Sequence, residues 1–138
     1  MTIKLQDIYG LAKTDILPAG GNPGQVLSKS SPNDGDVQWV DTAGRTWQTV
    51  TANTTAAAGD AFLVDTTAAA VTITLPGAPA TGDEVWFQDK KSNFGTNKLT
   101  AARNGKPIMG LAEDMDVEMD NAMFGLVFAD ATDGWRII

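Results

Sequence analysis

From residue 47 onward, short apolar runs alternate with clusters of turn-forming residues, and this pattern constrains the fold most strongly. The run 71–75 alternates apolar and hydroxyl side chains, which is typical of a half-buried β-strand. Turn-forming stretches such as Asn104-Gly105 and Asp133-Gly134 separate the runs. Strands are predicted at 47–51, 61–65, 71–75, 84–89, 98–102, 115–120, 124–129 and 135–138. No segment keeps a 3.6-residue period over three turns, so the predicted fold class is all-β, with a β-sandwich or barrel-like knob over 47–138.

Residues 1–19 differ in character, because their apolar side chains are irregularly spaced and specify neither a helix nor a strand. Ordering such a segment costs roughly 1–2 kcal/mol of backbone entropy per residue. We therefore expect a partner to order it, and we predict that it anchors the chain to a larger assembly. The candidate attachment residues are Ile3, Leu5, Ile8, Tyr9 and Leu11.

Residues 20–46 are predicted to be a linker rich in glycine and proline that contains a short β-hairpin. The two strand-like runs are 25–29 and 36–40, and the turn chemistry lies in 31–35 between them. The domain organisation expected from the sequence is thus an anchor at 1–19, this linker, and the knob at 47–138.

The residue inventory excludes several kinds of site. The chain has no cysteine and no histidine, so it cannot build a disulfide, a zinc–thiolate site or a Ser-His-Asp triad. Its net charge of −7 argues against binding nucleic acid, since phosphate contacts need clustered Lys and Arg. No run is long enough to cross a bilayer, so we expect no membrane insertion. We predict a protein without a cofactor that is not an enzyme.

Acidic residues offer the strongest alternatives to that prediction. On a strand, the carboxylates at 114, 116, 118 and 120 would share one face and could bind calcium or form a ring around a trimer axis. Parallel side chains do not wrap around an ion, so a solvated face is the favoured interpretation. Asp65, Asp83 and Asp89 could serve a glycosidase, but Asp at a turn more often accepts local backbone N–H groups.

Tryptophans are the other candidates for function. Trp39, Trp47 and Trp86 could contact a glycan or lie in a trimer interface, whereas Trp135 is predicted to fill the core. A domain of this size has a limited interior, and association between subunits would bury further apolar surface.

Two stretches of the sequence are similar to known protein modules. The first runs from Gly20-Gly21-Asn22-Pro23-Gly24-Gln25-Val26-Leu27-Ser28-Lys29 to Gly35-Asp36-Val37-Gln38-Trp39, and it is similar to a module common in phage fibre and appendage proteins. The second is similar to the β-rich knobs of phage fibres. Its matching elements are 62–66, 72–76, 82–85, Asp89, 94–100, 103–105, 108–110 and 134–137.

The resemblance implies a homotrimeric structural protein on the virion surface, assembled in the cytoplasm of the host bacterium. It implies docking on capsid or tail proteins through residues 1–19, with the knob displayed as a capsid decoration or head fibre. The alternative is a short tail fibre or adhesin that binds a host glycan or protein. A small hydrolase is a third hypothesis. The polysaccharide-cleaving spikes of phages resemble longer chains with an extended β-helix, and the sequence here has no repeat of that kind.

Overall fold

The computed structural model describes residues 21–23, 25–32, 36–41 and 44–138. The chain forms two compact units, Met1–Gly44 and Arg45–Ile138, and each is considered by itself. All regular elements in the described residues are β-strands, so the predicted all-β class is confirmed. The predicted attachment residues Ile3, Leu5, Ile8, Tyr9 and Leu11 lie outside the described residues.

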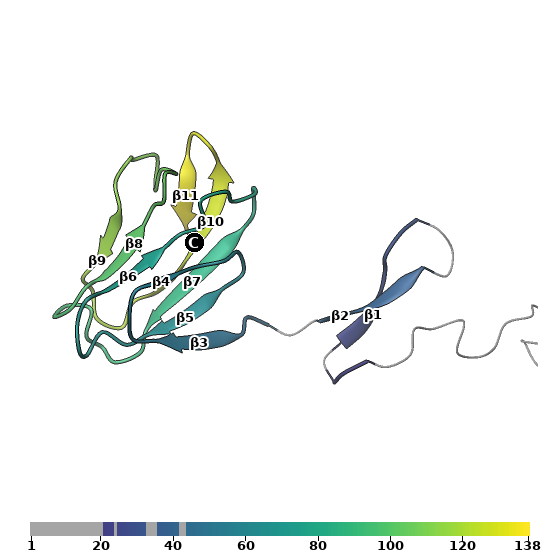
Figure 1. Cartoon of the computed structure of the whole chain (residues 1–138), viewed down its shortest axis with the longest axis horizontal. Helices are drawn as coiled ribbons and strands as arrows, with labels where there is room; N and C mark the ends of the chain where they lie inside the picture. Colours follow the sequence, from purple (N-terminus) through teal and green to yellow (C-terminus); the bar gives the residue numbers. More distant parts are fainter. Residues whose placement is uncertain (1–20, 24, 33–35, 42–43) are drawn as a thin grey trace, which may run out of the picture. The chain divides into compact units, whose positions relative to one another are not determined.

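The first unit contains the predicted hairpin. Strand β1 (Gln25–Lys29) pairs antiparallel with β2 (Val37–Asp41) (Figure 1). Leu27 lies opposite Trp39 in this pairing. The Trp39 ring packs on Gly21 so closely that a Cβ there would lie 2.8 Å from the ring. Gly21 therefore permits the close approach between the glycine-rich turn and the aromatic residue that ends the motif.

The second unit is a sandwich of two sheets (Figure 1). One sheet has the order β11-β10-β7-β5-β3, and the other has the order β4-β6-β8-β9. The strands are β3 (Trp47–Val50), β4 (Thr54–Thr55), β5 (Ala61–Val64), β6 (Val71–Thr74), β7 (Glu84–Asp89), β8 (Leu99–Ala102), β9 (Met115–Val117), β10 (Met123–Asp130) and β11 (Gly134–Ile137).

The chain passes back and forth between the two sheets, so that most neighbouring strands within a sheet run parallel. From β3 to β8, successive strands alternate between the sheets, so that β3, β5 and β7 pair in parallel in one and β4, β6 and β8 in the other. Strands β9, β10 and β11 then add antiparallel partners. This winding was not predicted, because the equivalent positions Trp47, Ala61 and Trp86 are unevenly spaced and leave no repeat in the sequence.

The parallel register stacks like side chains on one another in the core. Phe62, Phe87 and Phe124 occupy paired positions on three adjacent strands, with ring centroids 6.2 Å and 5.1 Å apart. Trp135 is fully buried and contacts Phe128 edge-on at 5.4 Å, which confirms its predicted place in the core. Aromatic pairs of this kind add about 0.5–1.5 kcal/mol beyond the burial of their surface.

The predicted strands all exist, with shifted ends. The largest difference is at β9, which ends at Val117 instead of continuing to Asp120. Asp120 turns away to accept the backbone N–H of Gly95, and Asn121 has a φ of 62°, so the chain bends there towards β10. Strand β4 was missed because two threonines are too short a run to show a period.

Replacing the middle phenylalanine of the row should weaken the whole sandwich. Phe87→Ala removes a fully buried ring that contacts both neighbours, and we expect a loss of about 3–5 kcal/mol in the free energy of unfolding. Urea denaturation at one fixed protein concentration measures it, with the exposed Lys91→Ala as control. A loss below about 1 kcal/mol would contradict the stacking described here.

Candidate functional site

Asp89 ends strand β7 and holds the loop that follows it. Its buried carboxylate accepts backbone N–H groups from Lys91, Asn93, Phe94 and Asn121, at 2.9–3.2 Å. A buried carboxylate surrounded by such donors is satisfied without a metal or a substrate. Asp89 therefore binds local backbone N–H groups, as the turn interpretation predicted, and it also joins its loop to Asn121, which is distant in the sequence.

The same corner is held by a second set of polar contacts. The side-chain amides of Asn93 and Asn97 both donate to the backbone carbonyl of the fully buried Thr66, at 3.0 and 2.9 Å. These bonds join the loop after β5 to the loop after β7, where the backbone has no strand partner.

The other aspartates singled out in the sequence also bind local backbone. Asp65 accepts the N–H of Thr67 at 3.1 Å and also its hydroxyl, and Asp83 accepts the N–H of Ala80 at 2.8 Å. The Thr67 bonds lower the pKa of the Asp65 carboxyl. Both groups are turn-forming residues.

The acidic stretch along β9 is bonded to its neighbours in the fold. Asp114 accepts the N–H of Arg103 at 2.9 Å, and Asp116 accepts the Lys98 ammonium at 2.5 Å and the Thr100 hydroxyl at 2.6 Å. The Lys98 bond, followed by the Thr100 bond, lowers the pKa of the Asp116 carboxyl. Within the described ranges, no three acidic, Cys or His side chains gather closely enough to hold a metal ion.

Three neighbouring residues hold Trp86 in place. One face of its indole lies on Gly125, where a Cβ would come within 2.6 Å of the ring, and the Arg45 guanidinium stacks 3.9 Å from the ring centre. Its Nε1 donates to Glu84, which also pairs with Arg45 at 2.7 Å. The Arg45 bond lowers the pKa of the Glu84 carboxyl. Neither an aromatic face nor the indole N–H of Trp86 is left for a sugar.

The other two tryptophans are placed differently. Trp47 is half-buried and lies in register with Ala61, which in turn pairs with Trp86, so the fold brings Trp47 and Trp86 into one row of the sheet. The fully buried Ala61 lies between them. Trp39 belongs to the other unit, where it packs on Gly21.

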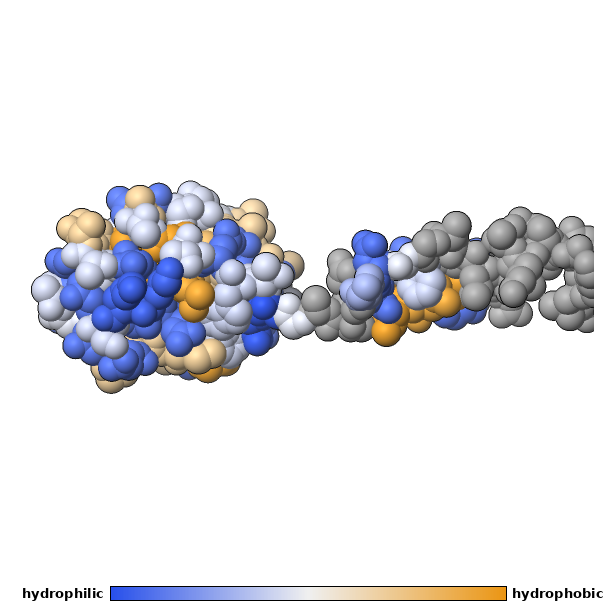
Figure 2. All heavy atoms as spheres, turned by 90° about the horizontal axis from the view of Figure 1, so that it is seen from below, coloured by the Kyte–Doolittle hydropathy of each residue, from blue (hydrophilic) through white to orange (hydrophobic). Residues whose placement is uncertain are grey.

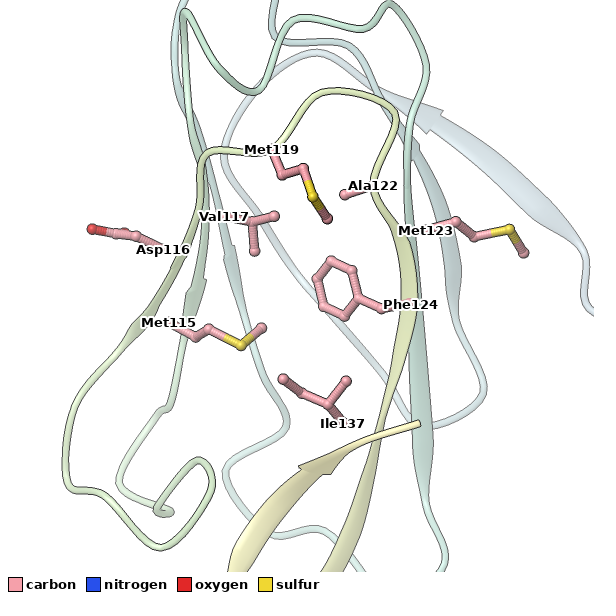
Figure 3. Close-up of a pocket in the computed structure, with 8 residues that line it drawn as sticks. All are labelled: Met115, Asp116, Val117, Met119, Ala122, Met123, Phe124 and Ile137. Atoms are coloured by element: carbon pink, nitrogen blue, oxygen red, sulfur yellow. The ribbon is translucent and has the colours of Figure 1, made fainter.

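The candidate functional site is an apolar groove of about 290 Å³ between β9 and the β10–β11 pair. Figure 3 shows Met115, Val117 and Met119 on one side pointing towards Phe124 and Ile137 on the other. Asp116 and Met123, which also border the groove, point away from its centre, and Ala122 closes one end with Met119 (Figure 3).

A smaller hollow of about 130 Å³ continues the apolar surface and shares Met115 with the groove. It adds Met109 and Leu111, which are 44% and 60% exposed. Four of the five methionines of the chain therefore border two adjoining hollows. The sequence held a signal for this surface, because Met115, Val117 and Met119 alternate with carboxylates over residues 115–119.

Comparison with known proteins identifies no family for the chain. No protein-family model matches it, and no curated protein is significantly similar to it. Among the residues that the structure describes, no helix has the length and apolarity needed to span a membrane.

Removing the Asp89 carboxylate should show its structural role. Asp89→Ala leaves four backbone N–H groups without their acceptor, so we expect a loss of at least about 3 kcal/mol in the free energy of unfolding. Chemical denaturation measures the loss. Asp133→Ala, which removes an exposed carboxylate, should stay within about 0.5 kcal/mol of the unaltered protein. Equal stabilities for the two variants would contradict the role assigned to Asp89.

Proposed function

We propose that this protein is a non-enzymatic structural component of a tailed-bacteriophage virion, displayed on the particle surface as a capsid decoration or head fibre. In this proposal residues 1–19 dock on other structural proteins of the particle. The unit 45–138 is the exposed knob. The chain assembles as a homotrimer.

The use of polar side chains in the knob is the observation that carries the non-enzymatic part of the proposal. Asp65, Asp83 and Asp89 accept hydrogen bonds that form turns, and Asp116 joins β9 to β8. The groove beside β9 is instead lined mainly by apolar side chains. General acid–base chemistry needs titratable groups that converge on a substrate, whereas these carboxylates are committed to the backbone and to Lys98.

The surface of the knob suits display in solvent. Figure 2 shows hydrophilic residues spread over the visible face of this unit, with hydrophobic residues in small groups between them. The identity as a virion protein rests on the resemblance of 20–39 and 62–137 to phage fibre modules. The separate hairpin unit and β-rich knob agree with that resemblance.

A glycan-binding adhesin is the alternative, and the geometry of Trp86 disfavours it. A tryptophan that binds a sugar offers an open aromatic face, and the faces of Trp86 meet Gly125 and Arg45. Binding to a glycan array that Trp47→Ala abolished would favour the adhesin instead.

Deleting residues 1–19 should separate attachment from folding. We expect the shortened protein to remain a folded trimer by light scattering and circular dichroism. It should no longer sediment with virus particles that lack their own copy, whereas the full chain should do so. A shortened protein that still binds the particles would contradict docking through this segment, and a monomeric full chain at micromolar concentration would contradict the trimer.

A further inference from the structure

The apolar groove beside β9 lies at an unfinished edge of the sandwich. Its lining includes Met119 and Ile137, which are 68% and 49% exposed although they border a pocket of apolar side chains. Solvent-exposed apolar surface of this kind marks sites where another chain binds. The groove has a volume of about 290 Å³, which is enough to receive large side chains.

The two strands that border the groove differ in their free edges. In the described part of the chain, β9 pairs with β8 on one side and with no strand on the other. The outer edge of β11 is already engaged at Trp135, whose backbone N–H donates to Pro107 and whose carbonyl accepts the N–H of Met109. An incoming strand therefore finds unpaired backbone at β9 and would lie over the groove.

Charge specifies the chemistry of that strand. Along β9, Met115 and Val117 face the groove, while Asp116 points away from it (Figure 3). The exposed Glu113 and Glu118 lie just outside β9 in the sequence, on either side of it. Lys98 forms an ion pair with Asp116. An added strand would place alternate side chains in the groove and the others on the side of Asp116, and Glu113 and Glu118 would lie near the two ends of β9.

We propose that the groove binds an extended segment of another polypeptide whose alternate residues are apolar and basic, by addition to the free edge of β9. The apolar residues fill the groove, and the basic residues pair with Glu113 and Glu118, because Asp116 is already bonded to Lys98. Methionine side chains are flexible and polarisable, so Met115 and Met119 adapt to different apolar residues. The proposal goes beyond attachment to the particle and does not depend on where the chain is anchored.

A second copy of this chain is the less suitable occupant. Pairing two β9 edges would bring two rows of carboxylates together, and like charges on opposed strands destabilise a sheet. A basic partner instead gains from the negative charge of the protein, and its association should weaken as salt is raised.

The test uses the full chain and two synthetic peptides of equal composition and charge. The probe alternates valine and lysine over eight residues, and the control has the same residues in pairs, valine-valine-lysine-lysine, twice. Fluorescence anisotropy of end-labelled peptides measures binding. We expect the alternating peptide to bind at least about tenfold more tightly than the paired one, because only alternation satisfies both faces of a strand. Hydrogen exchange should then show protection at Met115–Val117.

Substitutions at exposed positions should weaken this binding without unfolding the protein. Met119→Lys places a cation at the mouth of the groove, and Glu113→Lys with Glu118→Lys reverses the flanking charge. Each variant should bind the alternating peptide about tenfold more weakly. Asp133→Lys reverses one charge outside the groove lining and should leave binding within about twofold.

Three results would overturn the proposal. Equal binding of both peptides would mean charge attraction without strand addition. If neither peptide bound, the groove would not be a binding site for such a strand. Self-association of the full chain that Met119→Lys abolishes would make a second copy the occupant of the groove.

Discussion

The in-register stacking of parallel strands is the interaction on which the rest of the knob depends. Because β5 and β7 pair in parallel, Phe62 comes to lie beside Phe87, and the antiparallel addition of β10 then continues the row with Phe124. The same register places Ala61 between Trp47 and Trp86 on neighbouring strands. The core is therefore built from side chains at equivalent positions of neighbouring strands, although the sequence itself has no repeat.

Carboxylates accept hydrogen bonds from polar groups that have no partner in a neighbouring strand. At the end of β7, Asp89 collects backbone N–H groups from its own loop and from Asn121, which precedes β10. Asp116 joins β9 to β8 through Lys98 and Thr100. The acidic side chains of this histidine-free sequence thus stabilise the fold. This use of the carboxylates supports the proposal of a structural protein.

The sequence predicted most strands and the roles of several residues, because alternation and turn chemistry are local signals. The run 71–75 predicted β6, and a tryptophan after Asp133-Gly134 predicted a buried plug. Parallel pairing was not predicted, since coils of unequal length hide the equivalence of Trp47, Ala61 and Trp86. The sequence indicated one wall of the groove, because apolar residues and carboxylates alternate along β9. It did not indicate the opposite wall, because Phe124 and Ile137 come to lie there only through the fold.

These features describe a β-sandwich unit with an apolar groove beside the free edge of β9, and a hairpin unit that precedes it in the sequence. Such a molecule suits display on a particle, with the groove beside β9 as the proposed place for another chain to bind. The most direct measurement is a cryo-electron microscopy reconstruction of the virus particle on which we propose that this protein is displayed. The account predicts trimeric density on the particle surface, with the knobs outward and residues 1–19 against a capsid or tail protein. Particles without such density, or knobs buried inside the shell, would contradict it.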